Sequence, residues 1–436
     1  MVISSLARGG SERQLLATTH GLIRRGYHVE IVELARSPTD DVSFRDEWLQ
    51  LGLHTRCANE QLTLPFPQED SRTDAYGLSP FGPLIPHLSI TDLGAALHQA
   101  MDEVKPEIVH CWSDVANVVG GLVALTRGVP RIVLALRTVT AQRRNAPEAD
   151  LYREAHRQML GARNVTVIAN TAVNRDEHEH WLGVPSGTIK LLYNGFLPDS
   201  IRVRRGSELS EACRRLGVPD GVKTIGTLMR LAPEKDPDLW LETAARIAQI
   251  RPDTFFLLAG YGDLAADLAE KIRGRPELID RIRLIGPTTD PGLIYSALDV
   301  FLMTSLFEGS PNTLIEAQVA GVPIVAPRVG GTGETVVHGT TGLVVSDRDA
   351  ASLATAVLKI LSEAGWRQRT ARRGPAFVAR RFGHRRMIDE TVAIYGHPSS
   401  WSALGRRLWR TIRSRIAPDR VTLGWRAASR PEGRGS

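Results

Sequence analysis

Short apolar runs and longer amphipathic stretches alternate along most of the chain. Runs such as 165–169 and 255–259 have the length of buried strands. The stretches between the runs carry apolar residues at three- and four-residue steps, which is typical of helices packed on a core. Because parallel strands need a helix-length connection between them, this alternation predicts an α/β protein with parallel sheets.

The first residues predict the start of a Rossmann-like half. A strand is expected over 2–6, a glycine turn over 8–11, an amphipathic helix over 12–25 and a second strand over 27–32. Residues 54–90 contain several prolines and few periodic apolar positions, so we expect an irregular insertion there.

The chain is organised around residues 301–335. An apolar strand over 299–303 runs into a polar turn over 305–312, and a helix is expected over 312–320. Gly321 stands where a helix C-cap belongs, and a second strand and a second glycine turn follow it. Two strand–turn–helix edges therefore open side by side at the carboxyl ends of parallel strands, where doubly wound sheets bind nucleotides.

Two acids in this stretch are candidate ligands of a nucleotide. Glu308 lies in the polar turn, and Glu316, eight residues later, lies inside the helix. The helix N-terminus suits a phosphate, and Gly309 and Ser310 let the backbone approach one closely. A carboxylate one or two turns into the helix can accept both hydroxyls of a ribose. The alternative is a loop glutamate and a helix glutamate that both face solvent.

Several spaced motifs agree with one known pattern. The segments EGSPNTLIE (308–316), AGVPIV (320–325) and GGTGE (330–334) resemble the donor-site signature of family 4 retaining glycosyltransferases, which have the two-domain GT-B fold. The first glycine turn resembles the family's Gly-Gly-x-Glu-Arg start, and KLLYNG (190–195) resembles its Pro-Asn-Gly with tyrosine in place of proline. The likeness covers roughly 390 residues.

The resemblance implies two Rossmann-like domains that face each other across a cleft. Residues 1–195 would form the acceptor domain, and residues 196–381 would form the nucleotide-sugar donor domain. A last helix over 382–395 would cross back and pack on the first domain. Residues 396–436 lie beyond the likeness and are expected to form a basic amphipathic or disordered tail.

The loop after the predicted strand 223–228 carries two cations, Arg230 and Lys235, at the spacing that the family has. Two cations opposite a helix N-terminus can neutralise a leaving diphosphate without a metal. The alternative is two solvated surface cations. The family usually has glycine before the arginine, where this chain has Met229.

The resemblance also implies roles for single residues. Glu316 would hold the ribose, Glu308 would hold the donor sugar, and the turn at Gly286 would lie against the base. A strand over 106–110 ends in His110, which would face the cleft and approach the transferred sugar; the alternative is a histidine satisfied in the core. The expected catalytic residues are His110, Arg230, Lys235 and Glu308, and the expected donor-binding residues are Gly10, Gly286, Gly309, Ser310, Pro311, Asn312, Thr313 and Glu316.

Composition narrows the classes of partner. With 42% apolar residues, a chain of 436 residues can bury sizeable cores. Its three cysteines are far apart and lack pairing or metal spacing, which suits a reducing cytosol. Residues 401–436 hold nine arginines against Asp419 and Glu432, a charge of +7, so the remaining 400 residues sum to −1. A nucleic-acid role for the two domains therefore gains no support from charge.

The sequence predicts no metal, no cofactor and no membrane span. Two Asp-x-Asp tripeptides, at 236–238 and 347–349, match a metal–diphosphate motif of another fold but follow no suitable strand. No window reaches eighteen uncharged apolar residues, and the first residues lack the apolar core of a signal peptide.

The tail has a pattern of its own. Between 401 and 416, tryptophan, leucine and isoleucine recur at three- and four-residue steps, with arginines on the other faces. Such a basic amphipathic segment is a candidate for peripheral contact with an anionic membrane, on the inner face of the cell membrane. A helix packed on the body and a disordered tail are equally open.

These patterns predict a cytoplasmic enzyme that transfers a sugar from a nucleotide diphosphate to a hydroxyl acceptor and keeps the anomeric configuration. Uridine is the family's commonest base, and a tail at a membrane suits a lipid-linked saccharide acceptor. A nucleotide-sugar 2-epimerase of the same fold is one alternative, although such enzymes lack the spaced acids and cations found here. A degenerate binding member is the other, suggested by Met229 and the short first strand.

Overall fold

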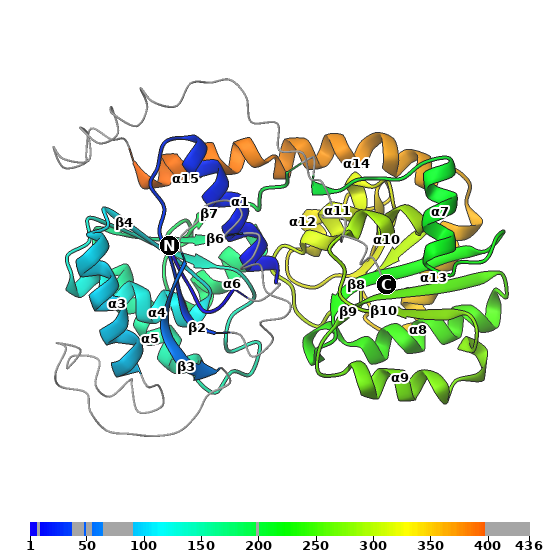
Figure 1. Ribbon diagram of the computed structural model, residues 1–436, viewed down its shortest axis with the longest axis horizontal. Helices are drawn as coiled ribbons and strands as arrows, with labels where there is room; N and C mark the ends of the chain where they lie inside the picture. Colours follow the sequence, from blue (N-terminus) through cyan, green and yellow to red (C-terminus); the bar gives the residue numbers. More distant parts are fainter. Residues whose placement is uncertain (7–8, 37–47, 49–54, 64–89, 198–199, 397–436) are drawn as a thin grey trace, which may run out of the picture.

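The computed structural model describes residues 1–6, 9–36, 48, 55–63, 90–197 and 200–396. Two parallel sheets with helices between their strands form two Rossmann-like domains, which lie side by side in Figure 1. This arrangement confirms the predicted α/β class and the predicted pair of facing domains.

The N-terminal domain has a seven-stranded sheet in the order β3-β2-β1-β4-β5-β6-β7, and every pairing in it is parallel. Its strands are β1 (Val2–Ile3), β2 (Ile31–Arg36), β3 (Thr55–Thr63), β4 (Ile108–Trp112), β5 (Arg131–Leu136), β6 (Val165–Ala169) and β7 (Lys190–Leu191). Its helices are α1 (Gly10–Arg24), α3 (Ile90–Val104), α4 (Asp114–Thr126), α5 (Ala149–Leu160) and α6 (Ala172–Leu182).

Three predicted segments of this domain are corrected. The first strand covers only Val2–Ile3, and the second begins at Ile31 instead of residue 27. These limits follow from the ladder, because Val2 pairs with Val32. Within the predicted irregular region, residues 55–63 form β3, an edge strand whose one partner among the described strands is β2. An edge strand needs fewer apolar residues, so its pattern is weak in the sequence. The rest of that region, 64–89, lies outside the described residues.

The C-terminal domain has a six-stranded parallel sheet in the order β10-β9-β8-β11-β12-β13. Its strands are β8 (Lys223–Arg230), β9 (Thr254–Tyr261), β10 (Ile282–Ile285), β11 (Val300–Leu302), β12 (Ile324–Pro327) and β13 (Gly342–Val345). Its helices are α7 (Ser207–Arg215), η4 (Pro233–Lys235), α8 (Pro237–Ile250), α9 (Ala265–Arg273), η5 (Pro276–Leu278), α10 (Pro291–Ala297), α11 (Asn312–Val319), α12 (Thr332–Thr335) and α13 (Ala350–Ser362).

Each sheet buries apolar side chains on both faces, as a doubly wound fold requires. The strand order reverses between β1 and β4 in the first sheet, and between β8 and β11 in the second. Loops at the carboxyl ends of strands on either side of such a reversal are the usual ligand site of these folds. The loops after β8 and β11 carry the predicted cations and acids.

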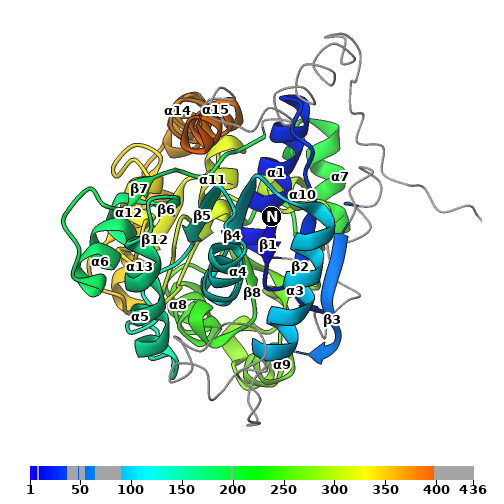
Figure 2. The ribbon, with the colours of Figure 1, turned by 90° about the vertical axis from the view of Figure 1, so that its left-hand side faces the viewer.

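Helices α14 (Trp366–Phe382) and α15 (His384–Tyr395) join the two domains along one side, where they run across the top of Figure 1. In Figure 2 they are seen nearly end on, and α15 lies above the N-terminal domain. Val378 and Phe382 of α14 pack on Ile315 of α11 in the C-terminal domain. Met387 and Ile388 of α15 join the core of the N-terminal domain. One continuous helical arm therefore belongs to both domains.

A carboxylate of the C-terminal domain also holds a helix of the N-terminal domain. Glu334 on α12 accepts hydrogen bonds from the backbone N–H groups of Ala172 (2.9 Å) and Val173 (2.8 Å), which begin α6. The hydroxyl of Tyr193 donates to the same carboxylate at 2.7 Å. A negative charge at this end complements the helix dipole and satisfies N–H groups that have no partner inside the helix. Glu334 thereby links the two domains.

We expect Glu334→Ala to lower the melting temperature by about 2–8 °C, because two backbone N–H groups lose a charged acceptor. Glu334→Gln keeps an acceptor oxygen and should have a smaller effect. The matched control is Glu211→Ala, which removes an exposed carboxylate paired only with Arg214 on α7 and should leave the melting temperature unchanged. Equal melting curves for Glu334→Ala and Glu211→Ala would show that Glu334 does not join the domains.

Candidate functional site

The loops after β8 and β11 lie against each other at the reversal of the C-terminal sheet. The backbone N–H of Leu306 donates to the carbonyl of Glu234 at 2.8 Å. The hydroxyl of Thr304 donates to the carbonyl of Lys235 at 3.0 Å. The segment with the predicted cations therefore packs on the turn that leads into α11, as the predicted site requires.

Lys235 and Glu308 are brought together at this point. The Lys235 Nζ lies 2.6 Å from the Glu308 Oε1, and the Glu308 side chain is only 10% exposed. Arg230 ends β8 and forms an ion pair with Glu234 on the same loop, with more than half of its side chain exposed. Each predicted cation thus has a carboxylate partner in this structure.

The turn before α11 presents an uncapped helix N-terminus. Pro311 occupies the N-cap position, and no described side chain caps the first turn. A β-carbon on Gly309 would lie 2.0 Å from the carbonyl oxygen of Arg137, so only glycine allows this turn to pack on the N-terminal domain. The Ser310 hydroxyl is buried and has no hydrogen-bond partner among the described residues.

Asn312 uses its side chain between the domains. Its Nδ2 donates to the carbonyl of Gly10 at 3.0 Å, and its Oδ1 accepts from Gln14 at 3.2 Å and from Asn194 at 2.8 Å. Gly10 is the first residue of α1, so the N-terminus of α1 lies beside that of α11. The two predicted donor-binding residues Gly10 and Asn312 are therefore in direct contact.

Glu316 is buried in α11 and is held from both domains. One carboxylate oxygen pairs with Arg13 of α1, and the other accepts from the Tyr295 hydroxyl at 2.8 Å. Burial and the Glu316 charge raise the pKa of Tyr295 well above its usual value, so this hydroxyl stays a donor. Tyr295 also donates to the carbonyl of Thr313 at 3.3 Å.

Gly286 lies directly after β10, at the carboxyl edge of the same sheet. A β-carbon there would meet no atom within 4 Å, so open space surrounds the residue. Its part in holding a base stays a prediction.

The predicted position of His110 is wrong. β4 continues through Cys111 to Trp112, so His110 lies inside the strand instead of at its carboxyl end. The side chain is 1% exposed, stacks on Trp112 and has its Nδ1 2.8 Å from the Tyr395 hydroxyl. Burial lowers its pKa well below the usual value. The strand continues because Trp112 pairs with Ala135 of β5. The hydrophobic pattern of residues 106–112 alone does not reveal this pairing.

Two charged residues that the sequence analysis did not assign lie at the same junction. Burial raises the pKa of the Glu12 carboxyl to about 7, against the attraction of Arg230 and Arg137. Burial likewise lowers the pKa of Arg137 to about 10. Glu12 could have been found from the sequence, because it belongs with Arg13 to the glycine-turn motif near the start. For Arg137 the sequence offered one clue, its position directly after a predicted strand.

The Asp-x-Asp tripeptides serve structural purposes. Asp236 caps α8 by accepting from the N–H of Leu239 at 3.0 Å, and it pairs with Arg348. Asp349 caps α13 by accepting from the N–H of Ser352 at 2.8 Å. Across the described part of the chain, no group of three or more histidine, cysteine or acidic side chains is placed to hold a metal ion. Metal-independent transfer stays a prediction.

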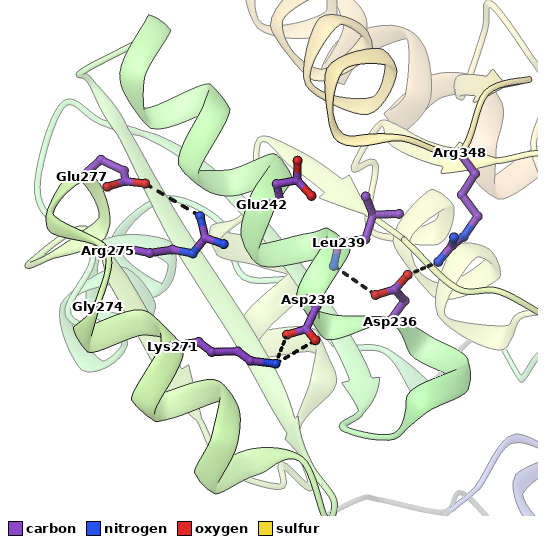
Figure 3. Close-up of a pocket in the computed structure, with 9 residues that line it drawn as sticks. All are labelled: Asp236, Asp238, Leu239, Glu242, Lys271, Gly274, Arg275, Glu277 and Arg348. Carbon is purple, nitrogen blue, oxygen red and sulfur yellow. Dashed lines mark hydrogen bonds and ion pairs between the residues drawn. The ribbon is translucent and has the colours of Figure 1, made fainter.

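A groove of about 690 Å³ lies on the outer side of the C-terminal domain, beside α8 and α9 (Figure 3). Most of its charged side chains are paired within the groove, as in the 2.7 Å contact between Lys271 and Asp238; Glu242 has no such contact in Figure 3. The residues that line it are Asp236, Asp238, Leu239, Glu242, Lys271, Gly274, Arg275, Glu277 and Arg348. Four acids against three cations leave the groove with a charge of −1, which does not suit a diphosphate. The groove adjoins the loop after β11, because Arg348 donates to the carbonyls of Thr304 and Ser305.

Among the helices that the structure describes, none combines the length and the apolar character needed to cross a bilayer.

Two family models match the chain. "Glycosyltransferase Family 4" matches residues 8–199, and "Glycosyl transferases group 1" matches residues 222–363. Each match covers one of the two sheets almost completely. The division between the two models therefore follows the division between the two domains.

Curated relatives share part of this chain. The Vi polysaccharide biosynthesis protein VipC/TviE of Salmonella typhi is 31% identical over 301 residues, which are 66% of this chain and 51% of that protein. The chain thus spans about half the length of this relative. The UDP-Gal:alpha-D-GlcNAc-diphosphoundecaprenol alpha-1,3-galactosyltransferase of Escherichia coli is 25% identical over 275 residues, 62% of this chain and 70% of that protein.

Solved structures share the fold over nearly the whole chain. Anabaena HepE, solved in complex with UDP and glucose, superposes with a TM-score of 0.69 at 20% identity and covers 90% of this chain and 98% of its own. At this identity the likeness concerns the fold alone. Together with the two family models, it shows that the chain belongs to the family 4, group 1 glycosyltransferases.

Proposed function

We propose that this protein transfers a sugar from a nucleotide-diphosphate sugar, UDP-linked, to a hydroxyl acceptor, with retention of the anomeric configuration. The observation that carries the proposal is the 2.6 Å contact between Lys235 and Glu308 beside the uncapped N-terminus of α11. A cation, an acid and free backbone N–H groups in one place are what a departing diphosphate and a bound sugar need.

The proposed reaction uses charges that the protein already holds in place. The bond between the anomeric carbon and the diphosphate oxygen breaks, and the diphosphate leaves with its electron pair. Lys235, Arg230 and the backbone N–H groups of Gly309, Ser310 and Asn312 stabilise the released negative charge. The acceptor oxygen bonds to the anomeric carbon on the same face, and its proton passes to the leaving diphosphate. Domain closure excludes water from this step.

The acids of the site would exchange partners when the donor binds. Glu316 is bonded to Arg13 and Tyr295 in this structure, and the ribose hydroxyls would replace Arg13 as donors to that carboxylate. Glu308 would keep contact with Lys235 and accept from the donor sugar. Tyr295 holds Glu316 in place during either exchange. His110 lies inside β4 instead of at its end, and its contact with the sugar stays a prediction.

The names of the relatives favour a role in cell-surface polysaccharide synthesis. One is a Vi polysaccharide biosynthesis protein, and another is named for an acceptor linked to diphosphoundecaprenol. We propose a lipid-linked saccharide as the acceptor of this chain. A basic segment over 401–416 would place the enzyme on the inner face of the cell membrane, near such an acceptor. That segment lies outside the described residues.

Lys235→Ala and Glu316→Gln should each lower the transfer rate at least about 100-fold, since one removes a cation from the leaving group and the other removes the ribose acceptor charge. The rate is measured as nucleotide release with a panel of UDP-sugars and a lipid-linked saccharide acceptor. The matched control is Lys271→Ala, which removes a lysine paired with Asp238 in the outer groove and should keep full activity. Full activity of Lys235→Ala would refute the proposed site. Isomerised donor in reactions without acceptor would instead identify an epimerase.

Donor affinity should fall as the pH rises from about 6 to about 8. The Glu12 carboxyl, with a pKa of about 7, is protonated below this range and charged above it. Its charge then opposes the diphosphate beside Arg230 and Arg137, which should weaken binding about three- to ten-fold. UDP-glucose binding by calorimetry is a suitable measurement, because its diphosphate does not titrate in this range. In Glu12→Gln the affinity should not change with pH; an unchanged pH dependence would exclude Glu12 as its source.

Full-length protein should sediment with vesicles that contain anionic lipid, and a variant lacking 401–436 should stay in the supernatant. Replacing Arg406, Arg407, Arg410 and Arg413 by glutamine should also abolish sedimentation, because the attraction to anionic lipid depends on these charges. Neutral vesicles serve as the control. Equal sedimentation of the full-length and shortened proteins would end the membrane proposal.

A further inference from the structure

We propose that Arg137 is a third cation of the donor site, contributed by the N-terminal domain, and that it binds an anionic oxygen group of the donor. This inference rests on the proposed function. The group is either a donor phosphate or a carboxylate on the donor sugar, and both present the paired oxygens that a guanidinium binds best.

Arg137 is held in a fixed place at the junction of the domains. It follows the last residue of β5, and its guanidinium lies 4.8 Å from the centre of the Trp112 ring. Its Nη2 donates to the Oδ1 of Asn194 at 2.7 Å. Its own carbonyl oxygen contacts Gly309 and accepts from Asn170 at 3.0 Å. A guanidinium fixed in this way loses little freedom when it binds a ligand.

The charge of Arg137 is not matched as the other cations of the site are. Lys235 pairs with Glu308, Arg230 pairs with Glu234, and Arg13 pairs with Glu316. Arg137 has no carboxylate within 4.0 Å among the described residues. Glu12 is the acid whose charge acts on it, and that carboxyl is itself half protonated near neutral pH. Arg137 is half-buried and its Nε is fully buried, so a cation kept there without a carboxylate partner indicates a site for an anion.

The surroundings of Arg137 contain further polar atoms without partners. The Arg137 Nε, the Ser310 Oγ and the Trp112 Nε1 are buried and make no hydrogen bond with any described residue. Ser310 is 7% exposed and Trp112 is 2% exposed. Asn194 connects Arg137 with Ser310, since it accepts from Arg137 and donates to the Ser310 carbonyl at 3.1 Å. Each unpartnered atom can donate a hydrogen, so a ligand with acceptor oxygens would satisfy them.

The neighbouring turn fixes which end of the donor is meant. Ser310 directly precedes the N-cap of α11, where the diphosphate is proposed to lie. Arg137 reaches this turn from the opposite domain, so it can contact the donor only when the domains are together. The nucleoside end, at Glu316 and Gly286, lies farther along the C-terminal domain. Arg137 therefore binds the diphosphate or the sugar that follows it.

The test compares wild type, Arg137→Ala and Arg137→Lys in the full-length protein. Affinities for UDP, UDP-glucose and UDP-glucuronate are measured by calorimetry, and transfer kinetics are measured with each active donor. For Arg137→Ala we expect a 10- to 100-fold loss of affinity, which is about the effect of removing one charge-assisted hydrogen bond. Arg137→Lys should keep only part of the affinity, because an ammonium group lacks the paired N–H groups with which a guanidinium binds two oxygens. The control is Arg127→Ala. Arg127 follows α4 just before β5 begins, so it lies at the amino ends of the strands, where it pairs with Asp102.

The three ligands distinguish the two sources of the anion. Loss of affinity for all three ligands assigns Arg137 to a phosphate, and loss for UDP-glucuronate alone assigns it to a sugar carboxylate. Affinities within two-fold of wild type for all three would overturn the inference while leaving the proposed transfer intact. A loss confined to UDP-glucose would also overturn it, since that sugar has no charge. Wild type that binds none of them would refute the proposed UDP donor itself, and the inference with it.

A purely structural role for Arg137 makes a different prediction. If Arg137→Ala unfolds, Arg137→Lys carries the comparison, because it keeps the positive charge and most of the stem. Methylguanidine added to Arg137→Ala should restore part of the transfer rate if the guanidinium contacts the donor. Absence of rescue in a folded variant with weakened binding would assign the loss to packing and overturn the inference.

Discussion

The contact between the turn 309–312 and the N-terminal domain is the constraint on which the rest of the structure depends. Gly309 lies so close to the Arg137 carbonyl that no side chain fits, and Asn312 bonds to Gly10 at the start of α1. Two helix N-termini are thereby held next to each other, although both carry partial positive charge. Such an arrangement is costly without an anion between them, which explains why acidic side chains gather there.

Ion pairs within the protein fill that need in this structure. Glu308, Glu316 and Glu12 each act on a cation of the junction, and the carboxylates of Glu308 and Glu316 are largely buried. Buried pairs contribute little net stability, because desolvation offsets most of their attraction. In the proposed reaction their value would lie in exchange: ribose hydroxyls would replace Arg13 at Glu316, and the diphosphate would meet cations that are already held at the junction. The charges of the site would therefore be in place before the proposed donor binds.

The sequence revealed most of the C-terminal domain, because its strands are apolar runs and its turns carry glycine and proline at fixed places. Helix α11 was expected over 312–320 and is found over Asn312–Val319. The pairing of Lys235 with the turn before α11 followed from the spacing of the motifs. The strands of the N-terminal sheet were placed less well, since the limits of β1 and β2 depend on partners and not on local composition.

What the sequence could not show is contact between distant segments. Arg13 meets Glu316 across 303 residues, and Tyr193 meets Glu334 across 141 residues. Tyr193 had looked like a departure from a proline, but its hydroxyl serves the joint between the domains. The strand end at His110 was misplaced for the same reason, because the pairing of Trp112 with Ala135 extends β4, and the contact with Tyr395 comes from the far end of the chain. Side-chain roles at a domain junction need the fold before they can be assigned.

The two places where the chain passes from one domain to the other have a mechanical consequence. Phe196 donates its N–H to the carbonyl of Phe382 at 2.6 Å, and His384 donates its N–H to the carbonyl of Phe196 at 3.2 Å. Both covalent crossings are therefore tied into a single pivot on one side of the molecule. A rotation of the lobes about that axis would keep both hydrogen bonds, and a small turn there would separate the far rims by the largest amount.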